Sequence, residues 1–325
     1  SEEQKKIQEG LISINKEIES GKFEWRDDLE DIHMNIESRL HDLVGLIAGK
    51  IHTGKSRNDQ VATSLRMYLK SRVDYIQSLI RNLEIEIVRK ADLNFGTIMP
   101  SYTHLQRAQP VLLSHHLMAY FEMLERDVSR FSECKTRMDE LILGSGAVAG
   151  SFYNIDRDFL AKELCFSRIN KNSIDGVSDR DFILDLANCI TTSMMHLTRL
   201  SEELILWSSE EFNFINLPDN VVTTSSMMPQ KRNPDYPELI RGKFGRTVGN
   251  LVSILTMLKA LPLSYNRDMQ EDKEPIFDSL DTYTSSIEVM IEIIKGADFN
   301  DKAMLDSTSG NILATDLADI LVMKG

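Results

Sequence analysis

Three connecting segments of the chain concentrate polar and charged residues for which a helical core has no packing use. The first segment, residues 52–60, reads HTGKSRNDQ and places Arg57 and Asn58 at the start of a long helical pattern. A helix N-terminus carries partial positive charge, so this position suits a carboxylate ligand. The structural alternative is an ordinary helix cap at Asn58 or Asp59 with solvated charges around it.

The second segment, residues 101–110, reads SYTHLQRAQP and contains one histidine. A lone histidine is more often structural than catalytic. Here, however, His104 lies between Thr103 and Gln106 in a connection that leads into a long helix. A histidine held in such a segment titrates near neutral pH and can deliver a proton.

The third segment, residues 223–234, reads TTSSMMPQKRNP, with Glu238 one turn into the next helix. The structural alternative is a flexible loop before a helix that begins at a proline. The pair of serines that begins at Ser225, the cation of Lys231 and the amide of Asn233 together suit a carboxylate and the negative charge that develops during a reaction. Such a loop can also close over a substrate and exclude water.

A fourth segment, residues 265–273, reads YNRDMQEDK and adds the phenol of Tyr265, the amide of Gln270 and the ammonium of Lys273. Arg180 supplies a further cation after the tripeptide VSD. Because these cations stand at loop positions in an acidic chain, they favour a small anionic substrate with several carboxylates.

The composition excludes several other classes of protein. The chain has 325 residues, of which 37 are Lys or Arg and 50 are Asp or Glu, so its net charge is −13. Such a surface repels nucleic acids and anionic lipids. No apolar run approaches the ~18 residues of a membrane-spanning helix, and the polar start lacks a signal-peptide pattern. Three widely spaced cysteines favour a reducing compartment, so we expect a cytoplasmic protein.

Apolar residues repeat with helical spacing along most of the chain. The fold class we predict is therefore all-α, an elongated bundle of long helices. Gly242, Gly245 and Gly249 fall on one helical face, where another helix could approach closely. The five expected helices cover residues 59–94, 110–143 (with Pro110 in its first turn), 180–212, 235–261 and 275–295.

The pattern divides the chain into three parts, and both ends look cut. We expect a partial N-terminal helical domain at 1–55, a central long-helix domain at 56–305 and the start of an incomplete C-terminal helical domain at 306–325. The apolar stripes are wide for one antiparallel neighbour, so self-association is favoured over a long monomeric bundle.

Two further motifs are misleading, and no metal site is expected. Residues 49–56 match the phosphate-loop pattern G-x-x-x-x-G-K-[ST], but the preceding segment has helical rather than strand spacing. The glycine-rich residues 144–150 follow a helix and read better as a tight turn than as a dinucleotide site. None of the seven histidines pairs with another ligand at metal-binding spacing.

These segments together resemble a known family. The sequence SSMMPQKRNP looks like the signature loop of the fumarase/aspartase lyase superfamily, and HTGKSRNDQ with SYTHLQRAQP resembles its argininosuccinate lyase branch, which includes the δ-crystallins. YNRDMQEDKE and ATDLADILVMKG fit the same branch. The resemblance extends along nearly the whole chain, with the motifs in the same order.

The resemblance implies a homotetramer with a helical core built from several subunits and active sites drawn from three of them. It also implies reversible cleavage of argininosuccinate to arginine and fumarate, in arginine biosynthesis or the urea cycle, without cofactor or metal. Two alternatives stay open. One is a catalytically silent, crystallin-like structural protein, and the other is a sister lyase acting on aspartate, malate or adenylosuccinate.

The resemblance also implies roles for individual residues. Ser225 matches the catalytic serine, and Lys231 with Asn233 would stabilise the doubly charged aci-carboxylate. His104 would protonate the leaving nitrogen, with Glu238 orienting it, although which of Ser225 and His104 acts as base stays open. The positions that match substrate-binding residues are Arg57, Asn58, Thr103, Tyr265, Gln270 and Lys273, with Arg180 and His33 as weaker matches.

Two positions depart from the family pattern, and one family element is missing. Thr224 stands where the superfamily usually has glycine, which could stiffen the loop, and Lys55 replaces a common arginine. The family also has an N-terminal stretch that supplies a substrate contact. We therefore expect the site in this sequence to be incomplete.

Overall fold

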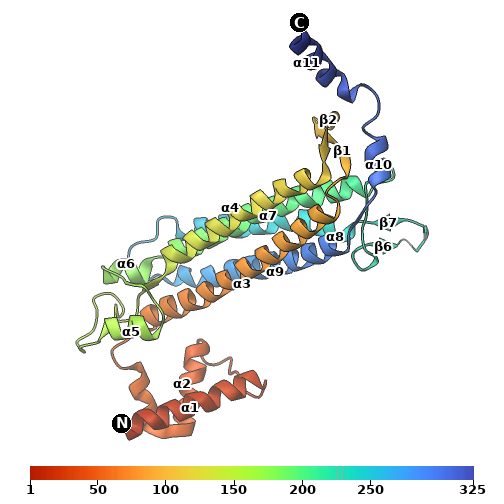
Figure 1. Cartoon of the computed structure of the whole chain (residues 1–325). Helices are drawn as coiled ribbons and strands as arrows, with labels where there is room; N and C mark the ends of the chain where they lie inside the picture. The colour runs from red at the N-terminus through yellow and green to blue at the C-terminus, as the bar shows by residue number, and fades with distance from the viewer. Residues whose placement is uncertain (225, 229) are drawn as a thin grey trace.

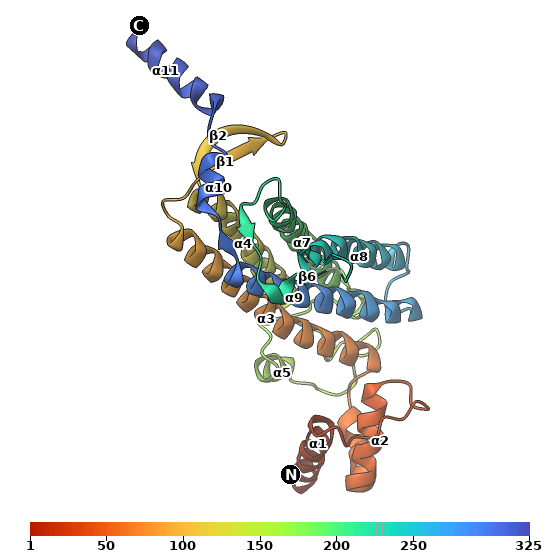
Figure 2. The ribbon, with the colours of Figure 1, turned by 90° about the vertical axis from the view of Figure 1, so that its right-hand side faces the viewer.

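A bundle of long helices dominates the computed structural model, which describes residues 1–224, 226–228 and 230–325 without the side chain of Asn311. Helices α3 and α4 pack together, α4 contacts α7, and α8 and α9 complete the bundle (Figures 1 and 2). The prediction of an all-α fold is therefore confirmed. The long helices are α3 (Arg57–Leu93), α4 (Leu113–Met138), α7 (Asp181–Trp207), α8 (Asp235–Leu258) and α9 (Lys273–Gly296).

Helix α3 begins at a capping box. The Ser56 side chain accepts from the helix backbone, and the Asp59 side chain accepts from the Ser56 backbone N–H. Ser56 is thus the cap residue, and the expectation that Asn58 or Asp59 caps the helix was wrong. The two reciprocal hydrogen bonds of the capping box explain why the helix starts after Ser56, because they satisfy two backbone N–H groups that have no acceptor within the helix.

The apolar stripes of the sequence form the core. On α7, the apolar residues with helical spacing are each 2% exposed or less; they are Ile183, Ala187, Ile190, Met194, Leu197, Leu200 and Leu204. The matching stripe on α3 packs into the same cluster, from Leu65 to Ile87. Helical spacing of apolar residues therefore located the packed faces correctly.

Smaller units lie at the two ends of the bundle. Helices α1 (Glu2–Glu19) and α2 (Ile32–Val44) with the 3₁₀ helix η1 (Gly45–His52) pack around their own core of Ile14, Phe23, Leu40 and Ala48. We call this unit the lobe; it lies beside the start of α3 (Figures 1 and 2). At the opposite end, α10 (Asp301–Asp306) and η4 (Asn311–Leu313) precede α11 (Ala314–Lys324), which projects away from the bundle.

The segment that contains His104 is a β-hairpin rather than a loop and helix start. Strand β1 (Ile98–Thr103) pairs antiparallel with β2 (Gln106–Leu112), and Pro100 lies opposite Pro110. The prediction that Pro110 begins the next helix was therefore wrong. The residue before a proline avoids the helical region, and α4 begins only at Leu113.

Short elements complete the connections, and helical periodicity could not reveal them because each has too few residues. Strands β3 and β4 pair in parallel, while β5 pairs with β8 and β6 with β7 antiparallel. Their bounds are β3 (Glu140–Leu141), α5 (Arg157–Glu163), β4 (Arg168–Ile169), α6 (Ser173–Ser178), β5 (Ile215–Asn216), η2 (Asp219–Val221), β6 (Thr223–Thr224), β7 (Arg232–Asn233), η3 (Arg267–Asp272) and β8 (Asp298–Phe299).

One face of α8 is open towards the described residues of the chain. A methyl group added at Gly242, Gly245 or Gly249 would meet none of their atoms within 4 Å, apart from the adjoining residues and backbone of α8 itself. Val252 and Leu255, further along the helix, are 53% and 50% exposed. None of the described helices combines the length and apolar character needed to cross a membrane.

Candidate active site

The candidate site residues lie in two groups at opposite ends of the bundle. Helix α3 has 37 residues, which at 1.5 Å per residue separates its ends by about 55 Å. The lobe end carries His33, Arg57, Asn58, Arg180, Tyr265, Gln270 and Lys273, and the hairpin end carries Thr103, His104, Lys231, Asn233 and Glu238. Ser225, the proposed catalytic serine, lies outside the described residues.

At the lobe end, Arg57 is held by three acceptors. Its guanidinium pairs with Asp31 at 3.2 Å and Glu37 at 3.1 Å, and donates to Gln60 Oε1 at 2.7 Å. Glu37 and Asp31 come from the lobe, so the fold fixes the orientation of Arg57 before any ligand binds. Of these partners only Gln60, one turn further along α3, could be anticipated from the spacing.

His33 joins the same group through Gln60. Its Nδ1 atom lies 3.2 Å from Gln60 Nε2. Burial lowers the pKa of His33; the nearby Asp31 carboxylate opposes this shift, and the charge of Arg57 reinforces it. The net effect favours the neutral ring.

The segment with Tyr265, Gln270 and Lys273 reaches this group from the other side of the bundle. Arg267 pairs at 3.1 Å with Glu30, which lies just before α2, so the pair ties η3 to the segment that leads into the helix of His33. Tyr265 is half-buried and Gln270 exposed. The fold thus gathers both candidate substrate segments at one end.

Arg180 is buried inside the bundle, whereas the sequence predicts an exposed loop position. It is 3% exposed, and its Nε atom donates to Asp272 at 2.6 Å. The opposite carboxylate oxygen of Asp272 accepts from the Lys273 ammonium at 2.7 Å. The expectation of a loop cation available to a substrate was wrong, because Arg180 is buried and holds the carboxylate that orients Lys273.

At the hairpin end, His104 is presented on a strained two-residue turn. Thr103 pairs with Gln106, so His104 and Leu105 form the turn, with φ values of 55° and 57°. Hairpins favour this left-handed turn, but the bulky Leu105 adopts it at a cost. Thr103 and His104 are both exposed, and the hairpin is anchored where the Tyr102 ring packs 5.6 Å from that of Phe212.

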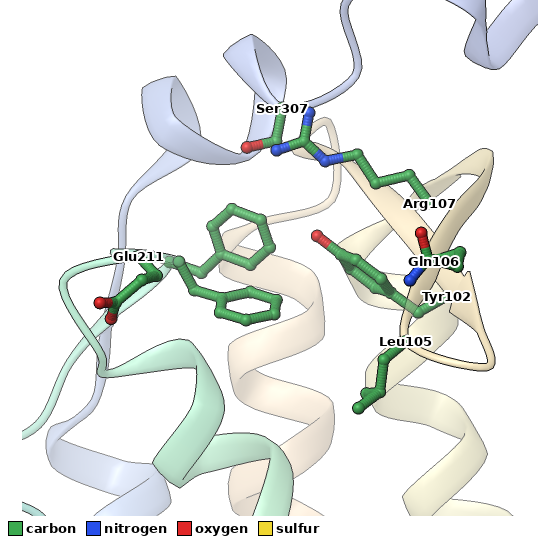
Figure 3. A pocket seen from close by; sticks show the side chains of 8 residues that line it. Tyr102, Leu105, Gln106, Arg107, Glu211 and Ser307 are labelled. Atoms are coloured by element: carbon green, nitrogen blue, oxygen red, sulfur yellow. The ribbon is translucent and has the colours of Figure 1, made fainter.

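A cavity of about 430 Å³ lies beneath this hairpin. In Figure 3 the Arg107 side chain extends from the hairpin towards Ser307. None of the described residues that line it is proposed for catalysis; they are Tyr102, Leu105, Gln106, Arg107, Glu211, Phe212, Phe214 and Ser307.

The polar loop at the hairpin end is closed at its base by a short ladder. Thr223 and Thr224 pair with Asn233 and Arg232, and the Arg232 guanidinium donates to Leu217 O at 2.8 Å. Lys231 is exposed and Asn233 half-buried. The ladder therefore holds both ends of the loop, and the described residues between them, 226–228 and 230–231, are exposed.

Glu238, in the first turn of α8, is exposed and lies 4.0 Å from Arg241 of the same helix. Among the described residues, Glu238 thus pairs with a neighbour on the surface of α8 rather than with His104.

The first of the two misleading motifs lies in a helical setting. Residues 49–56 begin within η1 and follow α2, so helices and not the strand that a phosphate loop needs lead into this motif. In the described part of the chain, no group of three or more histidine, cysteine, aspartate or glutamate side chains is arranged to hold a metal ion.

Comparison with known proteins defines the class. The sequence profile of a family described as "Lyase" matches residues 1–249, so the chain belongs to this lyase family. A class II fumarase from Schistosoma mansoni shares the fold, with a TM-score of 0.80 at 18% identity over 98% of this chain and 78% of that one.

The particular branch follows from closer relatives. An argininosuccinate lyase of Acinetobacter baumannii (strain AYE) is 52% identical over 320 residues, covering 98% of this chain and 67% of that protein. The chain belongs to the argininosuccinate lyase family. An EDDS lyase variant with bound fumarate has a TM-score of 0.89 and 30% identity, covering 99% of this chain and 63% of that one. The chain thus spans about two thirds of the length of these relatives.

Proposed function

We propose that this chain catalyses the reversible β-elimination of argininosuccinate to L-arginine and fumarate. The observation that carries the proposal is the 52% identity to an argininosuccinate lyase over 98% of the chain. The fumarate bound to the related EDDS lyase variant supports a four-carbon dicarboxylate as the shared part of the substrate.

The reaction needs a base at one carbon and an acid at the neighbouring nitrogen. The base removes a proton next to a carboxylate, the C–N bond breaks, and its loss leaves the double bond of fumarate. Ser225 is our candidate for the base, and the neighbouring Lys231 would favour its alkoxide. Lys231 and Asn233 would also stabilise the charge that develops on the carboxylate.

His104 is our candidate for the group that protonates the leaving nitrogen. Its position at the tip of a two-residue turn supports this role, because the turn fixes the ring outside the bundle, where a substrate can reach it. Glu238 would orient the imidazole and balance its charge from another copy of the chain.

The lobe-end group would bind the substrate, with its cations on the carboxylates. Arg57 and Lys273 supply charge, and Asn58, Tyr265 and Gln270 supply hydrogen bonds, with Thr103 contributing from the hairpin end. His33 would act through Gln60, to which it is bonded. The half-buried partners of Arg57 and the buried partner of Lys273 support this role, since they fix both cations in advance.

A complete site would need more than one copy of the chain. The two groups are about 55 Å apart along α3, and the open glycine face of α8 offers a surface for close helix contact. We propose a homotetramer in which antiparallel copies bring lobe end and hairpin end together, with three copies at each site.

Mixing two inactive variants tests this sharing. Arg57→Met and His104→Gln, refolded together, should regain part of the activity that neither has alone, because some sites then combine an intact lobe end with an intact hairpin end. The double variant Arg57→Met/His104→Gln, refolded by the same procedure, is the control. Mixtures as inactive as that control would contradict sharing between copies.

A substrate panel tests the reaction itself. Fumarate release, followed by ultraviolet absorbance, should occur with argininosuccinate and not with aspartate, malate or adenylosuccinate. Ser225→Ala should abolish release, and Ser226→Ala serves as the matched control. An active Ser225→Ala enzyme would refute its role as base, and substrate binding without turnover in the unmodified protein would favour the silent structural alternative.

The cellular location is a further part of the proposal. Cys134, Cys165 and Cys189 are all free thiols. Unpaired thiols persist in a reducing compartment, so we propose the cytoplasm.

A further inference from the structure

A buried aspartate at the start of α3 joins two segments that are far apart in the sequence. Asp59 is fully buried, and its Oδ1 atom accepts from the Ser56 backbone N–H at 2.8 Å. Its Oδ2 atom accepts two more bonds, from the backbone N–H groups of Gly144 at 2.9 Å and Gly146 at 2.8 Å. Helix capping needs only the first bond, so the other two serve the turn at residues 144–150.

This turn depends on the carboxylate for its shape. Gly144, Gly146 and Gly150 have φ values of 98°, 62° and 80°, and a Cβ atom at Gly146 would lie 2.3 Å from the carbonyl oxygen of Gly150. Within the turn, the Gly150 N–H donates to Ser145 O at 2.8 Å. The inward N–H groups of Gly144 and Gly146 have the Asp59 carboxylate as their acceptor.

Backbone N–H groups partly offset the cost of burying the Asp59 carboxylate. Burial raises its pKa, and the backbone N–H groups oppose that shift because they stabilise the ionised form. The guanidinium of Arg157, which donates to Leu143 O at 3.1 Å, adds a favourable charge nearby. The carboxylate is therefore part of a built, buried network.

The turn at residues 144–150 also lies next to the segments proposed to bind substrate. A cleft of about 300 Å³ lies between residues 54–56, just before Arg57, and residues 146–153. On its other side, the Ser264 hydroxyl donates to Ala147 O at 3.5 Å, a long bond. Ser264 directly precedes Tyr265, so one turn lies between the two candidate substrate segments.

We propose that Asp59 is a positioning residue that, by holding the turn at 144–150, fixes the Arg57–Asn58 segment relative to the segment of Tyr265. Its effect on catalysis rests on the proposed function, because those residues are the ones proposed to bind substrate. The effect of Asp59 on the shape of the turn does not depend on the proposed function. The effect on the turn and the effect on catalysis are therefore measured in separate experiments.

Backbone amide exchange tests the structural half. In the unmodified protein, the amides of Gly144 and Gly146 should be protected although they lie in a connecting segment. In Asp59→Asn they should exchange at least tenfold faster, a change about that expected when charge-assisted bonds are lost. Asp156→Asn is the matched control, since Asp156 accepts one backbone bond at the start of α5, from Phe159. Unprotected glycine amides in the unmodified protein would overturn the proposal.

Steady-state kinetics test the functional half. Asp59→Asn should raise the KM for argininosuccinate at least about tenfold, with a smaller change in kcat, because misplaced binding groups weaken substrate capture. Asp156→Asn should leave both constants unchanged. Faster glycine exchange with an unchanged KM would overturn the positioning role. Loss of turnover in the unmodified protein would instead contradict the proposed function and leave the exchange result valid.

A second variant separates positioning from helix capping and decides the matter if Asp59→Asn does not fold. Asp59→Glu keeps the Ser-x-x-Glu capping box, but the added methylene displaces the carboxylate from its present position against the glycine amides. Positioning predicts faster exchange at Gly144 and Gly146 and a raised KM. If Asp59→Glu behaves like the unmodified protein, Asp59 acts only as part of the helix cap and the positioning role is contradicted.

Discussion

The two ends of the bundle hold their candidate site residues in opposite ways. At the lobe end, buried or half-buried acceptors fix the cations: Asp31 and Glu37 hold Arg57, and Asp272 holds Lys273. At the hairpin end, His104 and Glu238 are exposed. The difference indicates that contacts within the chain organise the lobe end, whereas the fold leaves these two side chains of the hairpin end exposed.

The largest expected effect is at the hairpin end. His104→Gln should lower kcat by about 10²–10⁴-fold, the usual contribution of general acid–base catalysis. Unfolding by urea should be unchanged, because the exposed ring supports no packing. His115→Gln, an exposed histidine on α4, is the control for both measurements. A large loss of stability in His104→Gln would contradict the contrast between the two ends.

The next effect should be one of stability, at the lobe end. Arg180→Met leaves Asp272 buried with only Lys273, so the free energy of unfolding in urea should fall by about 3–5 kcal/mol. Arg246→Met, which breaks the exposed pair with Asp278, should cost about 0–1 kcal/mol. Equal losses in the two variants would show that Arg180 is not an internal support.

A smaller effect tests the strain at the hairpin tip. Leu105→Gly should raise stability by about 1 kcal/mol, since glycine adopts the left-handed conformation without the penalty of a side chain. It should also lower kcat, because His104 is then less firmly placed. Leu105→Ala keeps the strain and should give no gain in a thermal melt. A stabilised Leu105→Gly enzyme with unchanged kcat would mean that the strain does not serve His104.

The smallest effect concerns pH. The pKa of His33 is lowered in the folded state, so the unfolded chain takes up its proton first as pH falls through about 6.5. The contribution of His33 to stability is therefore present above that pH and lost as pH falls towards its folded pKa. Urea unfolding at pH 7.5 and 5.5 should show a smaller difference for His33→Gln than for the unmodified protein. His41→Gln, exposed on the same helix, should keep the full difference.

Local patterns in the sequence determined the helices and many of the polar segments. The spacing of apolar residues on α3 and α7 gave their buried faces, because a helix repeats every 3.6 residues. The same reasoning placed the His104 hairpin in a loop, since alternation over two short strands with a proline in each is weak. The roles of Ser225, His104 and the substrate-binding residues stay predictions that came from family resemblance.

Only the tertiary structure determined which charged side chains are buried in ion pairs within the protein and which lie near its surface. Arg180 and Arg57 look alike in sequence as loop cations, but one is buried against Asp272 and the other is held at the surface of the lobe. Asp59 looks like a helix cap, and its two further bonds reach glycines 85 and 87 positions away. Such pairings depend on distant segments meeting in space, and no local pattern encodes them.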